Sequence, residues 1–187
     1  VCNARGEPRL LQVMRTPRLT SEGEVEYLVC AAVDVTDRRR AEEALRKRLR
    51  YEKGIAEAST CLLVEGSCRD NITEALARLC ESAEVNRVYI FENIDDPANG
   101  LCMRQVYESC GPETSPQIDN PVLEHLPYPK GFERWRTTLS TGGAIQGVVA
   151  DFPKSERRIL EPQGILSILV LPLFIGGRWR GFIGFDD

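Results

Sequence analysis

Two cysteines, Cys102 and Cys110, have the side-chain type and spacing that could support redox chemistry. Eight positions apart, they share one face of a β-strand if that strand stays regular. A thiol pair beside a pocket can act as nucleophile and resolving thiol, whereas buried thiols are usually inert. The chain has seven cysteines, an odd number, and no C-x-x-C pair. We therefore expect most of the cysteines to be small core residues of a protein in a reducing cytoplasm, and we expect no disulfide.

Other catalytic residue types are sparse. His125 is the only histidine, which argues against a histidine-based zinc or iron site and leaves one candidate for a Ser-His-Asp triad. It reads as a loop residue. Asp151, Glu156 and Glu161 are not paired at a spacing that suggests acid/base catalysis. The sequence predicts no catalytic residue and no metal site.

Phe132 and Trp135 share one face of a predicted short helix and could stack on a planar ligand or pack in a core. They follow residues 111–131, a stretch with five prolines that reads as a long loop. Long loops in compact domains are usually lids or binding loops, so we expect this loop and helix to flank a pocket. The strand wall of that pocket is predicted to come from Phe91, Tyr107 and Val149.

The elements that must position these residues are organised around a hairpin in residues 164–187. Residues 165–175 are apolar on both faces, which is typical of a strand buried on both sides. Gly176 and Gly177 suit the turn, and an aromatic-rich partner strand follows. Further strands are predicted at residues 87–94, 101–110 and 144–150, and helices at residues 70–86 and 153–160 with the short helix of Phe132 between them.

The first sixty residues predict a hairpin and a long helix. Residues 10–15 and 25–35 are β-prone runs around a turn, and two strands alone are marginal in water. Residues 38–59 lack proline and favour helix. Apolar residues at alternating intervals of four and three positions predict a dimer seam through Leu45, Leu49 and Ala56. The polar residues Glu52 and Ser59 interrupt this seam. The alternative is a solvated helix with one face on its own domain.

Composition limits the class of partner. The net charge of −4 argues against a nucleic-acid surface, and 42% hydrophobic with 28% charged residues is ordinary for a globular protein. No apolar run reaches the length of a membrane span, so we expect a cytoplasmic segment without membrane contact. Because it begins at Val1 and stops after a strand, we expect a piece of a longer protein, whose anchor could lie elsewhere.

Residues 6–40 resemble the last two strands of a PAS domain. The similarity lies in GEPRLLQVMRTP, the turn at Glu22 and Gly23, and the ending Asp34-Val35-Thr36-Asp37-Arg38-Arg39. In that family such an Asp-x-Thr ending joins the sensor sheet to an outgoing signalling helix. The resemblance implies about a third of a PAS domain in residues 1–36, followed by a signalling helix in residues 37–59.

Residues 56–187 resemble a bacterial GAF domain at RVYIFEN, PQIDNP, LPYPKGFERW and the segment VADFPKSERRILEPQGILSILVLPLFIGGRWRGFIGFDD. The resemblance implies an α+β fold: an antiparallel sheet of five or six strands with helices packed on one side and a pocket on the other. The GAF domain would occupy residues 60–187, with its closing helix past Asp187.

The resemblance also implies a function. Cyclic-nucleotide-binding members carry an Asn-Lys-x-x-x-Phe signature that is absent here, and bilin-binding members place a Cys beside a His, whereas His125 follows Glu124. These departures disfavour cyclic nucleotides and bilins, and the single loop histidine His125 disfavours haem, so no cofactor is predicted. We expect a non-catalytic sensory module of a signalling protein, foremost a sensor histidine kinase, then a diguanylate cyclase or phosphodiesterase. It would bind a small molecule or signal through a homodimer of the long helix.

Two rivals stay open. A GAF-fold methionine sulfoxide reductase would use Cys102 and Cys110 as its two thiols. A purely structural dimeriser would have an empty pocket and a concentration-dependent dimer.

Overall fold

The structure, a computed structural model, describes residues 1–2 and 5–187. Residues 3 and 4, within the predicted segment 1–36, lie outside the described residues. The chain forms two compact units, Val1–Leu49 and Arg50–Asp187.

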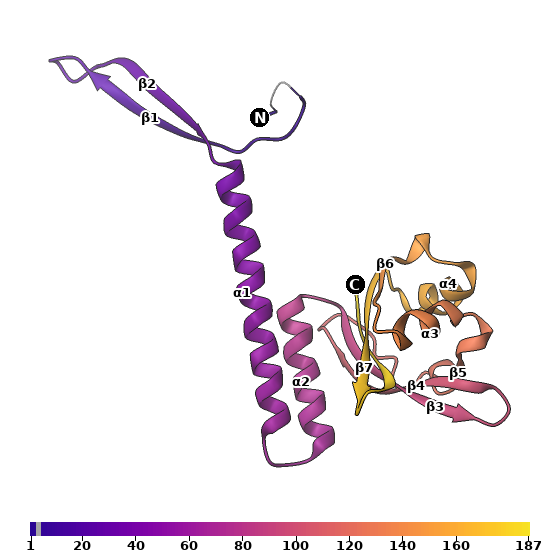
Figure 1. The fold of residues 1–187 in the computed structure, drawn as a ribbon. Helices are drawn as coiled ribbons and strands as arrows, with labels where there is room; N and C mark the ends of the chain where they lie inside the picture. The colour runs from indigo at the N-terminus through magenta and orange to yellow at the C-terminus, as the bar shows by residue number, and fades with distance from the viewer. Residues whose placement is uncertain (3–4) are drawn as a thin grey trace. The chain divides into compact units, whose positions relative to one another are not determined.

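The N-terminal unit contains the predicted hairpin. Strand β1 (Leu11–Leu19) pairs antiparallel with β2 (Val25–Asp34), and Figure 1 shows them as a two-stranded ribbon. Gly23 supplies a positive φ of 84° in the turn. Nearly all side chains of both strands are exposed, including Val13, Leu28 and Val29. The hairpin therefore presents apolar surface on both faces.

Asp34 and Thr36 join the hairpin to helix α1 (Thr36–Leu63). Asp34 Oδ1 accepts hydrogen bonds from the Thr36 backbone N–H at 2.9 Å and from its hydroxyl at 2.6 Å. Thr36 Oγ1 in turn accepts from the Leu10 N–H at 2.8 Å. These hydrogen bonds from Thr36 lower the pKa of the Asp34 carboxyl. The Asp-x-Thr pair thus ties the start of the helix to the start of β1.

The C-terminal unit is built on a six-stranded antiparallel sheet, which confirms the predicted α+β class. Its strands follow the spatial order β5-β4-β3-β8-β7-β6. They are β3 (Arg87–Asp96), β4 (Gly100–Cys110), β5 (Leu126–Pro127), β6 (Ile145–Val148), β7 (Ser167–Ile175) and β8 (Arg178–Asp186). The β7–β8 hairpin lies inside the sheet, between β3 and β6, as expected. The predicted burial of residues 165–175 on both faces is wrong in part, because Leu166, Phe174 and Ile175 are exposed, the last two beside the hairpin turn. The short edge strand β5 lies within the predicted loop and was missed because two residues carry no periodic signal.

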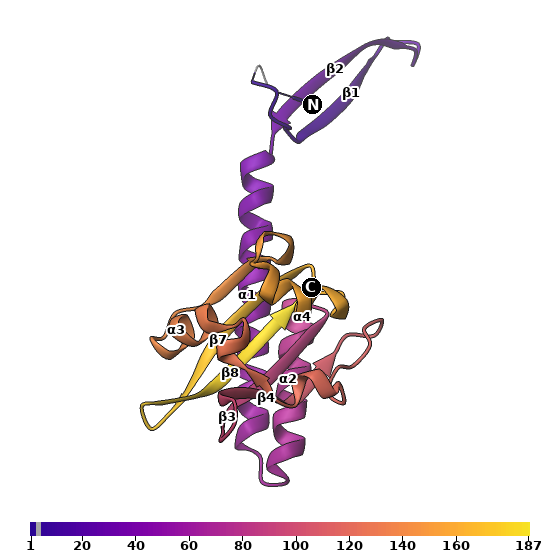
Figure 2. The ribbon, with the colours of Figure 1, turned by 90° about the vertical axis from the view of Figure 1, so that its right-hand side faces the viewer.

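Helices cover both faces of this sheet (Figure 2). Helix α2 (Cys68–Ala83) packs Leu76 and Cys80 against Val88 on one face. Helices α3 (Glu133–Ser140) and α4 (Lys154–Leu160) lie over the other face, where the larger apolar core sits. The N-cap of α2 is Ser67, whose hydroxyl accepts from the Asp70 N–H at 3.4 Å. The sequence predicted a start at residue 70, whereas the helix begins at Cys68, two residues earlier.

The end of α1 runs beside α2 (Figure 1) and approaches it at Gly54. A Cβ at Gly54 would stand 2.2 Å from the Ser82 Cβ, closer than any real contact. Gly54 and Ala58 are buried on this side, whereas Leu45, Leu49 and Ala56 are exposed. In the part of the chain that the structure describes, no helix is long and apolar enough to cross a membrane.

Candidate functional site

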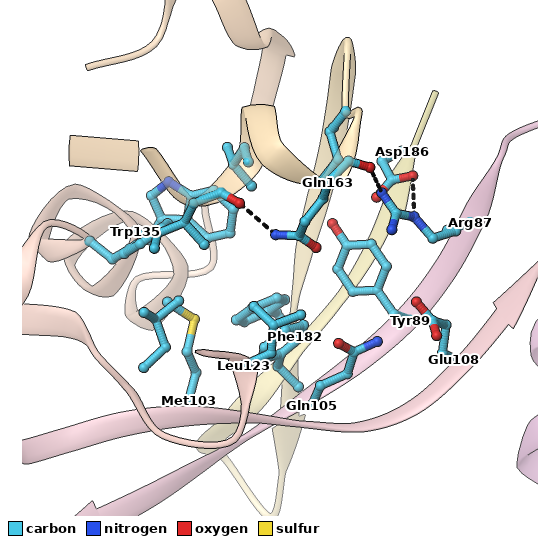
Figure 3. A pocket seen from close by; sticks show the side chains of 16 residues that line it. Arg87, Tyr89, Met103, Gln105, Glu108, Leu123, Trp135, Gln163, Phe182 and Asp186 are labelled. Carbon is cyan, nitrogen blue, oxygen red and sulfur yellow. Dashed lines mark hydrogen bonds and ion pairs between the residues drawn. The ribbon is translucent and has the colours of Figure 1, made fainter. Parts of the chain in front are cut away.

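A cavity of about 30 Å³ lies between the sheet and the layer of α3, α4 and the long loop (Figure 3). Its apolar wall is formed by Phe91, Met103, Leu123, Leu126, Phe132, Trp135, Ile159, Leu160, Ile165 and Phe182. Its polar end is formed by Arg87, Tyr89, Gln105, Glu108, Gln163 and Asp186. The volume corresponds to about two water molecules. The cavity is therefore small and amphipathic.

Arg87 and Asp186 form a buried ion pair at the polar end. They face each other across β3 and β8, and only 3% and 2% of their side chains are exposed. Arg87 Nε donates to Asp186 Oδ1 at 3.1 Å, and Arg87 Nη2 donates to the Gln163 carbonyl at 3.0 Å. Burial raises the pKa of Asp186 to about 6, against the opposing effect of Arg87. Asp186 Oδ2 has no hydrogen-bond partner among the described residues.

A β-bulge in β4 decides which side chains enter the cavity. Ile90 pairs with Tyr107 and Phe91 with Gln105, so Val106 is the extra residue. Before the bulge Gln105 faces the cavity; after it, Tyr107 faces α2 and Glu108 faces the cavity. The bulge therefore replaces a tyrosine by a carboxylate in the cavity wall.

Glu108 also holds the long loop. Its Oε2 accepts from the backbone N–H groups of Gln117 and Ile118, at 2.7 and 2.9 Å. Its Oε1 and the Oε1 of Gln105 are buried, and neither has a hydrogen-bond partner within the described ranges 1–2 and 5–187. Together with Asp186 Oδ2, three unpartnered acceptor oxygens belong to residues of this one cavity wall. Buried acceptors without partners are costly, so they mark a place for a hydrogen-bond donor.

Aromatic rings form much of the remaining wall. Phe91 and Phe182 stack with ring centroids 4.9 Å apart, and Trp135 meets Phe182 edge-on at 5.8 Å. The ring of Tyr89 lies over Gly184. A Cβ at position 184 would stand 2.2 Å from this ring, so a residue other than glycine would displace it. Burial raises the pKa of Tyr89 well above its usual value. The Tyr89 hydroxyl thus stays a neutral donor.

Glu156 of α4 fixes Trp135 of α3 in this wall. It is 1% exposed and accepts from Trp135 Nε1 at 2.9 Å. Arg134 adds two bonds, from Nε at 3.0 Å and from Nη2 at 2.6 Å. Such a bidentate pair is strong and directional. The role of Glu156 is therefore structural: it joins the two helices that cover the cavity.

Of the predicted pocket residues, Phe91, Phe132 and Trp135 line the cavity. Tyr107 lies on the opposite face because of the bulge, and Val149 is buried in the same core without lining the cavity. Sequence reasoning missed the polar end. Arg87 begins β3 and Asp186 ends β8, each next to an apolar run. A prediction that β3 pairs antiparallel with β8 would have placed the two side chains next to each other.

Cys102 and Cys110 do not come together. They lie near opposite ends of β4, about 25 Å apart at 3.3 Å per residue, and the bulge places them on opposite faces. Burial raises the pKa of both thiols, that of Cys110 to about 11. A raised pKa lowers the thiolate fraction and hence reactivity. The geometry gives the reductase alternative no support.

The remaining candidates are not brought into a site. His125 is exposed on the loop, near Asp96. All seven cysteines are free thiols. Within the described residues, no group of three His, Cys, Asp or Glu side chains could hold a metal ion.

Comparison with solved structures defines the fold of the C-terminal unit as that of a GAF domain. The phycocyanobilin-bound GAF domain of a cyanobacterial phytochrome matches with a TM-score of 0.58 and 17% identity, over 73% of this chain and 79% of that one. A phycoerythrobilin-bound GAF domain from a cyanobacterial phytochrome matches with a TM-score of 0.52 and 16% identity, over 75% and 80%. At these identities the likeness concerns the fold alone.

In sequence, the chain is 40% identical over 182 residues to the methanogenesis regulatory histidine kinase FilI of Methanothrix harundinacea. The match covers 97% of this chain and 20% of that protein. The chain thus spans about a fifth of the length of the relative it matches. No family model matches the chain.

Proposed function

We propose that the chain is a cytoplasmic, non-catalytic sensory module of a histidine kinase, in which a small molecule bound in the GAF cavity changes the packing of helix α1. The observation that carries the proposal is the cavity itself, whose wall contains three buried acceptors that have no partner among the described residues. The similarity to a regulatory histidine kinase supports the class of parent protein. Residues 1–36 would be the end of a PAS domain and residues 37–59 the signalling helix.

A continuous series of contacts leads from the cavity to α1. The backbone oxygen of Asp186 accepts from the Asn86 N–H at 2.9 Å. Asn86 follows the end of α2, where Ser82 meets Gly54 of α1 and Glu84 pairs with Arg50. A ligand that alters Asp186 would therefore act on the α2 terminus against which α1 packs. Signalling follows if two helix arrangements differ in their affinity for the ligand.

Thermal denaturation in the presence of small metabolites tests the proposal. The panel contains amines, short carboxylates, oxyanions and polyols. At a hundredfold excess over Kd, a cavity ligand should raise the midpoint by roughly 5 °C. The effect should vanish in Leu123→Phe, which adds bulk to the cavity wall, provided that this variant still unfolds cooperatively.

Val122→Phe is the matched control, since the neighbouring Val122 is 51% exposed and does not line the cavity. It should keep the full response to every active compound. The proposal fails if no class of compound stabilises the wild type, or if Leu123→Phe responds as strongly as Val122→Phe.

A further inference from the structure

We infer that the cavity binds a small primary ammonium ion, with methylammonium as the representative probe. The inference deepens the proposed function and rests on it, because it names the chemistry of the ligand. It starts from three acceptor atoms of the cavity wall that receive no hydrogen bond from the part of the chain that the structure describes: Gln105 Oε1, Glu108 Oε1 and Asp186 Oδ2. Gln105 is 8% exposed and Asp186 2%, so bulk water does not solvate them freely.

The number and type of unpartnered atoms match an ammonium group. A primary ammonium carries three N–H donors and no acceptor. Among the described residues the cavity wall offers three such acceptor oxygens, two of them on carboxyl groups, and Figure 3 shows the ring of Tyr89 between Asp186 and the side chains of Gln105 and Glu108. An anion or a carbonyl compound would bring further acceptors to this end of the cavity and leave the same oxygens unsatisfied.

Charge favours the same ligand. The polar end holds two carboxylates, Glu108 and Asp186, against one guanidinium, Arg87. Arg87 already donates to Asp186 and to the Gln163 carbonyl. Burial is the main cause of the raised pKa of Asp186, and the negative charge of Glu108 adds to it. A monovalent cation would bring this end of the cavity to neutrality.

The apolar wall and the volume set the size of the ligand. The rings of Tyr89, Phe91 and Phe182 lie in the wall, and aromatic faces attract ammonium ions. A cavity of about 30 Å³ has room for about two non-hydrogen atoms. Methylammonium has two non-hydrogen atoms: a nitrogen that suits the polar end of the cavity and a methyl carbon that suits its apolar wall.

Calorimetric titration of the chain with methylammonium chloride tests the inference, with potassium chloride at equal ionic strength as reference. We expect saturable binding at one site per chain for methylammonium and none for potassium. Glu108→Gln should weaken binding at least about tenfold, because it removes a charge-assisted acceptor. Gln105→Met should also weaken it, without touching the loop that Glu108 holds.

Glu124→Gln is the matched control, because Glu124 is exposed on the same loop and does not line the cavity. It should bind as the wild type does. Affinity should rise from pH 5 to pH 7 as Asp186 ionises beside Arg87, Tyr89, Glu108 and Asp187, the charged and titratable groups that act on it.

The inference is overturned if methylammonium gives no saturable heat, or if Glu108→Gln and Gln105→Met bind as tightly as Glu124→Gln. It is equally overturned if a high-resolution crystal structure in methylammonium shows only water bonded to the three oxygens. In each case a different compound that stabilises the wild type but not Leu123→Phe would leave the sensory proposal standing. If no compound does so, both fail.

Discussion

Arg87 and Asp186 form a buried ion pair at the cavity, and the contribution of this pair to stability can be tested by removing one or both charges. Arg87→Leu leaves Asp186 without its partner in a site where it is 2% exposed, so we expect a loss of about 3–5 kcal/mol in the free energy of unfolding. Arg87→Leu/Asp186→Leu removes both charges and should recover much of that loss. Urea denaturation measures both. Equal losses in the single and the double variant would show that packing, rather than charge pairing, dominates.

The pH dependence of stability tests the same carboxyl. The pKa of Asp186 is about 6 in the folded chain and 3.8 in the reference state, so the folded state binds the proton more tightly. The contribution of Asp186 to the free energy of unfolding is therefore fully present below pH 3.8 and is lost as the pH rises through 6. A pKa difference of about two corresponds to about 3 kcal/mol. Asp186→Asn should lack this decline. The pKa values of Asp34 and Asp96 are lowered, so these two carboxyl groups change the stability only below pH 3.8, outside the range in which Asp186 titrates.

At the residue scale, the sequence predicted aromatic residues that line the cavity and missed the polar residues of its wall. Phe132 and Trp135 share a helical face, which is a local pattern. Arg87 and Asp186 are 99 positions apart, and only the pairing of β3 with β8 brings them together. Single-sequence patterns carry no information on such long-range pairing.

Gly54 illustrates how one element limits another. In an isolated helix Gly→Ala stabilises by about 1 kcal/mol, but here the added Cβ would stand 2.2 Å from the Ser82 Cβ. We therefore expect Gly54→Ala to lower the thermal midpoint, because α1 and α2 must separate. Gly54→Ala/Ser82→Gly should restore it at least in part. A stabilised Gly54→Ala would contradict the close approach of the two helices.

The elements themselves were largely predictable. The three hairpins, the long helix and the helices on either side of the sheet follow from apolar periodicity and turn residues. The bulge at Val106 was not predictable, because one extra residue leaves the strand signal intact while it reverses the alternation beyond it. That reversal explains why Tyr107 was assigned to the pocket and Glu108 was not.

For the whole molecule, self-association of α1 is the next prediction. Leu45 and Leu49 are 58% and 55% exposed. Pairing of two α1 helices would bury these side chains and stabilise the dimer by roughly 2 kcal/mol per leucine. The exposed β1–β2 edges can also pair between chains, so the test compares chains with and without residues 1–35. In sedimentation equilibrium, Leu45→Glu/Leu49→Glu should abolish the dimer of the shortened chain. A dimer as tight as that of its parent would show that the seam is ordinary surface.

Coupling between the cavity and the proposed dimer is the central claim, because such coupling would make the molecule a sensor. The most direct measurement is the dimer dissociation constant of the wild-type chain by sedimentation equilibrium, in methylammonium chloride and in potassium chloride at equal ionic strength. The account predicts that the two constants differ at least about fivefold, the lower range of allosteric coupling. Equal constants in a buffer where calorimetry shows the cavity to be filled would contradict it.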